Sequence, residues 1–393
     1  MADFLPPMRL VGAAVLRDGV LQSRSVALAA GRITRGPLPE VDLTGYYVLP
    51  GIVDLHGDGF ERHISPRPSA PFPIATGLAG YDREAASCGV TTAYLAQGWS
   101  WEGGHRGPDA AEALFAALDA FRPQALTDLR IQIRAETHLV SEGARLIDTV
   151  RRHAIGYVVF NDHLGEAVEM RRSTPGDFAS WAHKIGRRPE ELWAAIGAAT
   201  ARAPDVPRHL CRLAEAFDGM GVEYGSHDDP DGDTRERYRM IGARIAEFPI
   251  THQAASAAKA MDSPVVMGAP NVVRGKSQAG NIAATDLIAA GNCDALVSDY
   301  HLPALALAAW ALVDLGICDL AKAWAMISAA PAAILRLTDR GRIEPGRRAD
   351  LVIVNQTTRA VEATIAGGRL AYLAGNAAGR FITGFPALRL AAE

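Results

Sequence analysis

The sequence predicts an α/β fold: a (β/α)8 TIM barrel joined to a small β-sandwich. Three observations support this prediction. Eight apolar runs in the middle of the chain alternate with helix-like stretches, as in a barrel. Both ends of the chain contain short strand-like runs broken by glycine turns. The 393 residues, 49% hydrophobic and 21% charged, have the composition of a globular protein with a sizeable core.

The two ends of the chain have similar patterns of short strands and turns. Residues 1–48 contain brief apolar runs separated by Asp-Gly and Gly-Arg turns, and residues 345–393 contain one continuous strand and shorter pieces around Gly-Gly and Gly-Asn. Turns of this kind separate neighbouring strands. We therefore expect residues 1–48 and 345–393 to form the β-sandwich together, and residues 49–344 to form the barrel.

The middle of the chain alternates between strands and helices. Helical patterns such as those at 109–121 and 191–203 follow apolar runs. A doubly wound sheet has the same alternation and is the alternative fold. The predicted barrel strands lie in the segments 47–56, 89–97, 129–138, 155–163, 221–229, 244–252, 264–270 and 294–300.

Composition excludes several classes of partner. The net charge is -4, whereas proteins that bind nucleic acid usually have a basic surface, so we expect no nucleic acid partner. The longest apolar run, 302–313, is too short to cross a membrane and stops at Asp314. The N-terminus is not typical of a signal peptide. Four scattered cysteines predict a reducing, cytoplasmic location; they are Cys88, Cys211, Cys293 and Cys318.

Polar residues gather where the predicted strands end, which is where barrel enzymes have their active sites. Carboxylates so close together repel unless a cation neutralises them, and imidazole with carboxylate suits Zn²⁺, Mn²⁺ or Fe²⁺. His56 and Asp58 have strand spacing, so both side chains leave one face. A metal-free polar site is the alternative. These residues are His56, Asp58, Glu136, His138, Asp162, His163, His227, Asp228, Asp229, His252 and Asp299.

Several segments, in order along nearly the whole chain, resemble the amidohydrolase superfamily, and more closely its PhnM-type branch of phosphonate breakdown. They are "HGDGFERHISPRP", "RAET", "NDH", "GSHDD", "AEFPIT", "MGAPNVVRGKSQAGN", "VSDY" and "DRGRIEPGRRADLV". The resemblance implies a barrel with one or two divalent ions, zinc first and manganese or iron as alternatives. It also implies hydrolysis of a ribose phosphonate triphosphate with release of pyrophosphate.

The resemblance also implies roles for individual residues. Asp299 and His227 are the candidate catalytic residues, with Asp299 as ligand or general base. Glu136 is the candidate for a bridge between two ions, because no lysine is evident at a strand end. The implied metal ligands are His56, Asp58, Glu136, His163, His227 and Asp299.

Cationic and amide side chains in the strand-end loops are candidates for binding the substrate's phosphates. Phosphoryl transfer needs charge neutralisation and positioning, and arginine presents a planar fork that suits phosphate oxygens. For each of them, a surface charge or an ordinary polar loop is the alternative. The candidates are Arg62, His63, Arg67, Asn271, Arg274 and Lys276, with Asn281 as a further polar candidate.

Four positions depart from the family pattern, and all four lie in strand-end loops, where substrates are selected. The loop after His163 reads "DHLGEAVE", Gln278 replaces a histidine, and His252 and His301 are additional histidines. The reaction class is therefore a firmer prediction than the substrate.

Two other functions stay open at this point. One is hydrolysis of a C–N bond, as in deacetylases, cyclic amidases or deaminases, although a neutral amide does not need cationic loops. The other is a non-catalytic scaffold, although every expected ligand position is filled. We expect a small anionic phosphorylated substrate and no membrane partner, and leave a homo-oligomer open.

Overall fold

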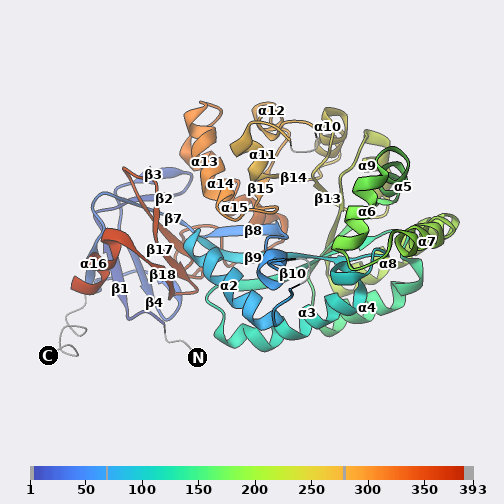
Figure 1. Ribbon diagram of the computed structural model, residues 1–393. Helices are drawn as coiled ribbons and strands as arrows, with labels where there is room; N and C mark the ends of the chain where they lie inside the picture. The colour runs from blue at the N-terminus through green and yellow to red at the C-terminus, as the bar shows by residue number, and fades with distance from the viewer. Residues whose placement is uncertain (1–3, 68–69, 278–279, 385–393) are drawn as a thin grey trace.

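The structure, a computed structural model, describes residues 4–67, 70–277 and 280–384. Its largest sheet contains eight parallel strands, each paired with the next along the chain. A backbone bridge between Gly57 and Asp299 links the first strand to the segment after the last, so the sheet closes into a barrel (Figure 1). The predicted fold class is confirmed. The barrel strands are β8 (Ile52–Gly57), β9 (Val90–Trp99), β10 (Asp128–Glu136), β11 (Tyr157–Asn161), β12 (Glu223–His227), β13 (Ile245–Glu247), β14 (Val265–Gly268) and β15 (Ala295–Val297).

The first predicted strand, 47–56, is divided in two. Its first half belongs to β7 (Tyr46–Pro50) in a smaller sheet, and its second half belongs to β8 in the barrel. Gly51 lies between them, and a Cβ at this position would lie 2.4 Å from the hydroxyl of Thr91. A residue without a side chain therefore allows the backbone to pass close to β9 where the chain enters the barrel.

Helices connect the strands and surround the barrel (Figure 1). Four of them, α5 to α8, lie between β11 and β12. One-turn 3₁₀ helices lie at Gly104–Arg106, Arg122–Gln124, Val140–Glu142 and Ala203–Asp205. The α-helices are α1 (Glu61–Ile64), α2 (Ile74–Ser87), α3 (Pro108–Phe121), α4 (Gly143–Arg152), α5 (Leu164–Ser173), α6 (Pro175–Lys184), α7 (Pro189–Thr200), α8 (Val206–Met220), α9 (Gly232–Met240), α10 (His252–Ala260), α11 (Ala269–Arg274), α12 (Ala284–Ala289), α13 (Ala304–Asp314), α14 (Leu320–Ala325), α15 (Ala329–Ile334) and α16 (Gly375–Thr383).

One hydrophobic cluster fills the interior of the barrel. Val53, Tyr94 and Val159 from the strands pack there with Ala332 and Leu335, which lie in and just after α15. Apolar side chains thus occupy this part of the barrel, and the carboxyl ends of the strands are left for polar residues. No helix in the described ranges is long and apolar enough to cross a membrane.

Two smaller sheets lie together on the left in Figure 1, and the larger of them combines strands from the N-terminal and C-terminal parts of the chain. The four-stranded sheet has the order β5-β4-β1-β6, and the six-stranded sheet has the order β18-β17-β16-β7-β2-β3. Residues such as Leu10 and Ile353 share one core between them. The division of the chain into domains at 48 and 345 stays a prediction. The remaining strands are β1 (Met8–Val11), β2 (Ala14–Arg17), β3 (Val20–Gln22), β4 (Val26–Ala29), β5 (Arg32–Thr34), β6 (Glu40–Asp42), β16 (Leu351–Asn355), β17 (Val361–Ala366) and β18 (Arg369–Leu373).

Candidate active site

A cavity of about 960 Å³ lies at the carboxyl ends of the barrel strands. Because all eight strands run parallel, residues distant in sequence meet at this end. The polar lining includes His56 from β8, Arg134 from β10, His227 from β12, and Asp228 and Asp299, which follow β12 and β15. Two strand-end histidines, His56 and His227, thus share one cavity.

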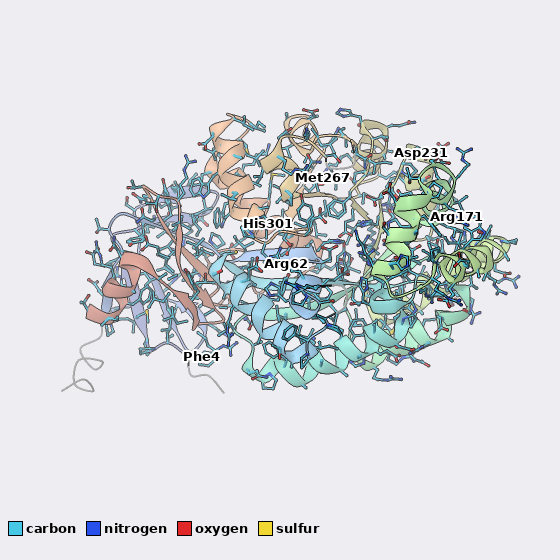
Figure 2. All side chains as sticks on the ribbon, in the orientation of Figure 1. Phe4, Arg62, Arg171, Asp231, Met267 and His301 are labelled. Atoms are coloured by element: carbon cyan, nitrogen blue, oxygen red, sulfur yellow. The ribbon has the colours of Figure 1, made fainter. Side chains whose placement is uncertain are left out.

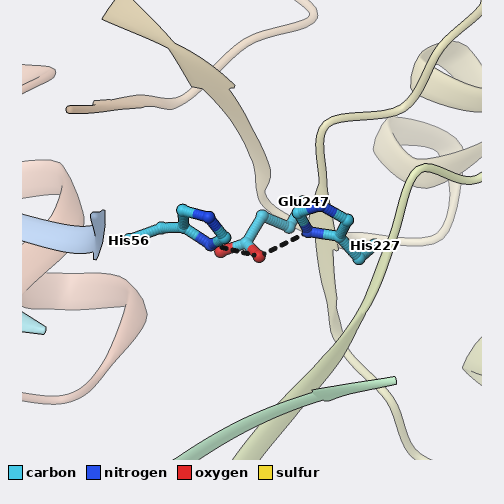
Figure 3. Close-up of side chains that lie close together, drawn as sticks. All are labelled: His56, His227 and Glu247. Carbon is cyan, nitrogen blue, oxygen red and sulfur yellow. Dashed lines mark hydrogen bonds and ion pairs between the residues drawn. The ribbon is translucent and has the colours of Figure 1, made fainter. Parts of the chain in front are cut away.

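Glu247, the last residue of β13, is fully buried and accepts four hydrogen bonds. Its Oε2 accepts from Nδ1 of His56 and from Nδ1 of His227, each at 2.9 Å (Figure 3). Its Oε1 accepts from the Gln132 amide at 2.8 Å and the Tyr157 hydroxyl at 3.1 Å. Burial alone would raise the pKa of Glu247, but the two histidines hold it well below its usual range. The carboxylate is therefore ionised and acts as an acceptor only.

Glu247 fixes the orientation of both histidines. Since each Nδ1 donates to the carboxylate, each Nε2 is left to interact with other groups. The two imidazole rings stack with centroids 5.3 Å apart, and the Phe248 ring lies edge-on to both, at 5.1 Å from His56 and 5.0 Å from His227. Burial lowers the pKa of His227, which favours the neutral ring that can bind a metal. A carboxylate behind a histidine is the usual support of a metal ligand.

A second group of side chains meets the first at His227. Nδ1 of His163 lies 2.6 Å from Oε1 of Glu136, whose Oε2 also accepts from the Trp101 indole at 3.2 Å. Nε2 of His163 and Nε2 of His227 lie 3.7 and 3.4 Å from Oδ2 of Asp228. Both oxygens of Glu136 thus have partners, and one of them orients His163. The role of Glu136 as a metal ligand or a bridge between two ions stays a prediction.

These donors could hold a divalent metal ion. One ligand atom each of His163, His227 and Asp228 lies within 4.8 Å of the other two, and imidazole with carboxylate is a common ligand set for zinc. Burial would lower the pKa of His163, but Asp228 and Glu136 raise it to about 10. Without an ion this ring carries a proton, which a metal would have to displace.

The predicted ligands Asp58 and Asp299 lie at the same mouth. The backbone N–H of Asp58 donates to the carbonyl of Asp299 at 2.8 Å, and the N–H of Asp299 donates to the carbonyl of His56 at 3.0 Å. Asp299 lines the cavity, and burial raises its pKa to about 6. Asp58 does not line this cavity, and neither residue belongs to a metal-ligating group among the described residues.

Backbone strain gathers at this end of the barrel. Asp228, Phe248 and Asp299 have φ angles of 57°, 52° and 54°, in the left-handed region that non-glycine residues seldom adopt. Each of these residues lies one or two positions after the end of a barrel strand. Such strain persists where the surroundings fix it, and it is common at functional sites.

The cations of the first loop are engaged with α2. Arg62 and His63 both pair with Glu84, and the contact between His63 Nε2 and Glu84 Oε2 measures 2.6 Å. Arg62 also donates to the carbonyl of Tyr300 at 3.1 Å, so it lies beside the loop that carries His301, as Figure 2 shows. Neither Arg62 nor His63 lines the cavity that contains the strand-end histidines.

Three other predicted substrate-binding residues do line the cavity: Asn271, Arg274 and Lys276. Arg274 donates to the Tyr300 hydroxyl at 3.3 Å. Asn271 donates to the carbonyl of Ile282 at 3.1 Å, which holds two parts of this loop together. Asn281 also lines the cavity, whereas Arg67 is exposed and lies outside it.

Arg134 and Glu247 contribute to the site but were not predicted as functional residues. Arg134 lies two residues before Glu136 on β10, so the strand period directs both into the barrel. Glu247 ends the sixth barrel strand, within the segment "AEFPIT". The signal for Glu247 was its position at a strand end, because the neighbouring strand β12 ends in His227 and the segment after β15 carries Asp299. Asp228 was noted only as one of several strand-end carboxylates.

The departures from the family pattern have different structural outcomes. The loop "DHLGEAVE" forms α5, and Met170 from α5 and Asp177 from α6 line the cavity. His252 and His301 are exposed and do not line it. Gln278 lies outside the described residues.

The comparisons with known proteins agree with this fold. The amidohydrolase family model matches residues 214–371. The alpha-D-ribose 1-methylphosphonate 5-triphosphate diphosphatase of Escherichia coli (strain K12) is 28% identical over 352 residues, which cover 86% of this chain and 91% of that protein.

Solved structures with low sequence identity share the fold. A β-aspartyl dipeptidase from Fervidobacterium islandicum AW-1 has a TM-score of 0.61 at 13% identity, covering 94% of this chain and 97% of its own. N-acetylglucosamine-6-phosphate deacetylase from Pasteurella multocida has a TM-score of 0.61 at 12% identity, with coverage of 93% and 99%. The chain thus has a (β/α)8 barrel that is partly matched by the amidohydrolase family model, and its predicted resemblance to that superfamily is confirmed.

Proposed function

We propose that this protein is a metal-dependent hydrolase that cleaves a phosphoanhydride of a ribose phosphonate triphosphate and releases pyrophosphate. The observation that carries the proposal is the convergence of Nε2 of His163, Nε2 of His227 and Oδ2 of Asp228 beside a cavity with three basic side chains. The similarity to the Escherichia coli diphosphatase over most of both chains supports the choice of reaction.

The chain's own residues supply most of the functions that such a reaction needs. His163, His227 and Asp228 would hold the ion, while Glu247 and Glu136 orient the two rings. A divalent ion supplies, when bound, positive charge that lowers the pKa of water and neutralises phosphate oxygens. His56, Asp58 and Asp299 lie at the same mouth and stay proposed ligands, for this ion or for a second one.

Asp299 is the proposed general base. Its carboxylate lines the cavity, and burial raises its pKa to about 6, so near neutral pH it is ionised but still basic enough to accept a proton. Water attacks phosphorus and gives its proton to Asp299. The bridging P–O bond breaks, and its electron pair leaves with the departing phosphate oxygen.

Arg274 and Lys276 are the proposed contacts for the substrate's phosphates. They lie on one side of the cavity, in and after α11, and the helices α5 and α6 supply Met170 and Asp177 as another part of the wall. With a net charge of -4 for the whole chain, local cations must bind an anionic substrate.

The four cysteines are free thiols in the structure, which supports a proposed cytoplasmic location. Zinc is the first candidate for the ion, with manganese and iron as alternatives.

The test measures phosphate and pyrophosphate release from a panel of sugar and nucleoside triphosphates, alongside hydrolysis of cyclic amides. The purified protein is assayed before chelation, after it, and after zinc or manganese is restored. We expect pyrophosphate from a sugar triphosphate, loss on chelation and recovery with metal. Asp299→Asn should reduce turnover about 10²- to 10⁴-fold, the usual contribution of a general base.

Two outcomes would contradict the proposal. Full activity in a protein shown to be metal-free would exclude the ion. Turnover of a cyclic amide without any triphosphate cleavage would favour C–N hydrolysis instead. Far-UV circular dichroism of the Asp299→Asn protein separates a catalytic loss from unfolding.

A further inference from the structure

Arg134 lies at the centre of the candidate active site. It projects from β10 on the same face as Gln132 and Glu136, and it lines both the large cavity and the small space around Glu136 and His163. Its charge acts to lower the pKa of the carboxyl groups around it, which belong to Glu61, Glu136, Asp228 and Asp299. The guanidinium thus lies in direct contact with His227, one of the residues that would hold the metal.

The contact between Arg134 and His227 involves the lone pair that a metal would use. Nη2 of Arg134 lies 3.2 Å from Nε2 of His227. A guanidinium has donors only, so the imidazole nitrogen must be the acceptor. Nδ1 of His227 already donates to Glu247 at 2.9 Å, which leaves Nε2 as the only nitrogen with a lone pair. Arg134 and a metal ion therefore cannot use His227 at the same time.

Arg134 keeps hydrogen-bonding capacity beyond its contact with His227. Among residues 4–67, 70–277 and 280–384, no carboxylate forms an ion pair with it, and its Nε is buried without a hydrogen-bond partner. A buried, unpaired guanidinium nitrogen is costly, and a tetrahedral anion would satisfy it. The planar fork of arginine suits phosphate oxygens.

We propose that Arg134 occupies His227 Nε2 in the metal-free protein and, once a metal displaces it, binds the phosphate or phosphonate group of the substrate. The inference rests on the proposed metal centre and names the residue that connects the ion with the anion. By linkage, an anion that holds the guanidinium away from His227 tightens metal binding, and the metal tightens anion binding by the same factor.

The experiment measures metal affinity rather than turnover. Metal-free wild-type protein, Arg134→Gln and Arg134→Lys compete with a chelating dye for zinc, with and without sulfate as a tetrahedral anion that binds zinc weakly. We expect Arg134→Gln to bind zinc at least tenfold more tightly than wild type without sulfate. Sulfate should tighten zinc binding to wild type and leave Arg134→Gln unchanged. Arg134→Lys keeps the charge but loses the fork, and should show a reduced sulfate effect.

Arg106→Gln is the matched control. Arg106 also lies beside this group and pairs with Glu61, but it does not contact His227. If Arg106→Gln tightens zinc as much as Arg134→Gln, a general change of charge explains the effect and the proposal is wrong. Unchanged zinc affinity in a folded Arg134→Gln protein, or an unchanged sulfate effect, also overturns it.

The outcomes separate this inference from the proposed function. If zinc binds to neither wild type nor Arg134→Gln, both fail. If zinc and sulfate behave as expected but no triphosphate is cleaved, the role of Arg134 stands and the substrate assignment fails. If triphosphates are cleaved and zinc affinity does not depend on Arg134, only this inference fails.

Discussion

Glu247→Gln is the substitution that best tests how the metal ligands are oriented. The carboxylate is fully buried and accepts from two imidazoles, one amide and one hydroxyl. An amide of the same shape has one oxygen and one NH₂ group, so one side of the group can no longer accept. If the NH₂ group takes the Oε2 position, both histidines lose their common Nδ1 acceptor and the rings could turn away from the cavity; if it takes the Oε1 position, Gln132 and Tyr157 lose theirs. In either orientation the negative charge behind the two rings is lost.

The expected magnitude follows from these contacts. Hydrogen bonds to a charged group contribute about 1.5–3 kcal/mol each, and a buried donor left unsatisfied costs about 1–3 kcal/mol. The substitution turns two acceptor contacts on one oxygen into donor–donor contacts, so we expect a loss of about 3–5 kcal/mol in the free energy of unfolding. Loss of a carboxylate behind a metal-binding histidine typically weakens metal affinity about 10- to 100-fold.

The assay combines zinc affinity by dye competition with chemical unfolding of the metal-free protein. Asp82→Asn is the matched control, because Asp82 is also buried and accepts from the backbone of Leu126 and Thr127 and from the Thr127 hydroxyl. Asp82 lies on α2, away from the strand-end histidines. We expect the control to lose stability and keep its zinc affinity.

The reasoning fails if Glu247→Gln binds zinc as tightly as wild type while it remains folded. It also fails if Asp82→Asn weakens zinc binding to the same extent, because the effect would then follow from general destabilisation. A stability loss below about 1 kcal/mol for Glu247→Gln would mean that water or a rearranged ring replaces the lost contacts.

Two further predictions concern phosphate binding and pH. Arg274→Ala should raise KM for a triphosphate about tenfold, because Arg274 lines the cavity. Arg62→Ala should leave KM nearly unchanged, because Arg62 is paired with Glu84. Steady-state kinetics measure both values, and a larger effect for Arg62 than for Arg274 would reverse the assignment. Burial lowers the pKa of His209 to about 4 from 6.5, so the folded protein binds fewer protons and stability is lost as pH falls from about 6.5 towards 4. The loss should reach about 2–3 kcal/mol near pH 4.5. His209→Gln should be less sensitive to pH in urea unfolding, and equal sensitivity would exclude this histidine as the cause.

Local patterns were enough to predict the fold. Apolar runs, helical periodicity and glycine turns are properties of neighbouring residues, and each of the eight predicted segments overlaps a barrel strand. The position of polar residues at strand ends is equally local, and parallel strands bring those ends together whatever the details of packing. His56, His227 and Asp299 could therefore be placed at one mouth from the sequence.

Side-chain partners depended on tertiary structure, because they join residues that are distant in sequence. Glu247 lies 191 residues from His56, and only the closed barrel makes it the common acceptor of two histidines. Arg62 was a candidate for phosphate binding by its neighbours in the chain, yet the packing of α1 on α2 directs it to Glu84. The sequence thus determined which kinds of groups reach the barrel mouth. The tertiary structure decided which of these groups face the cavity and which are held by other side chains, because hydrogen bonds and ion pairs depend on distance in space.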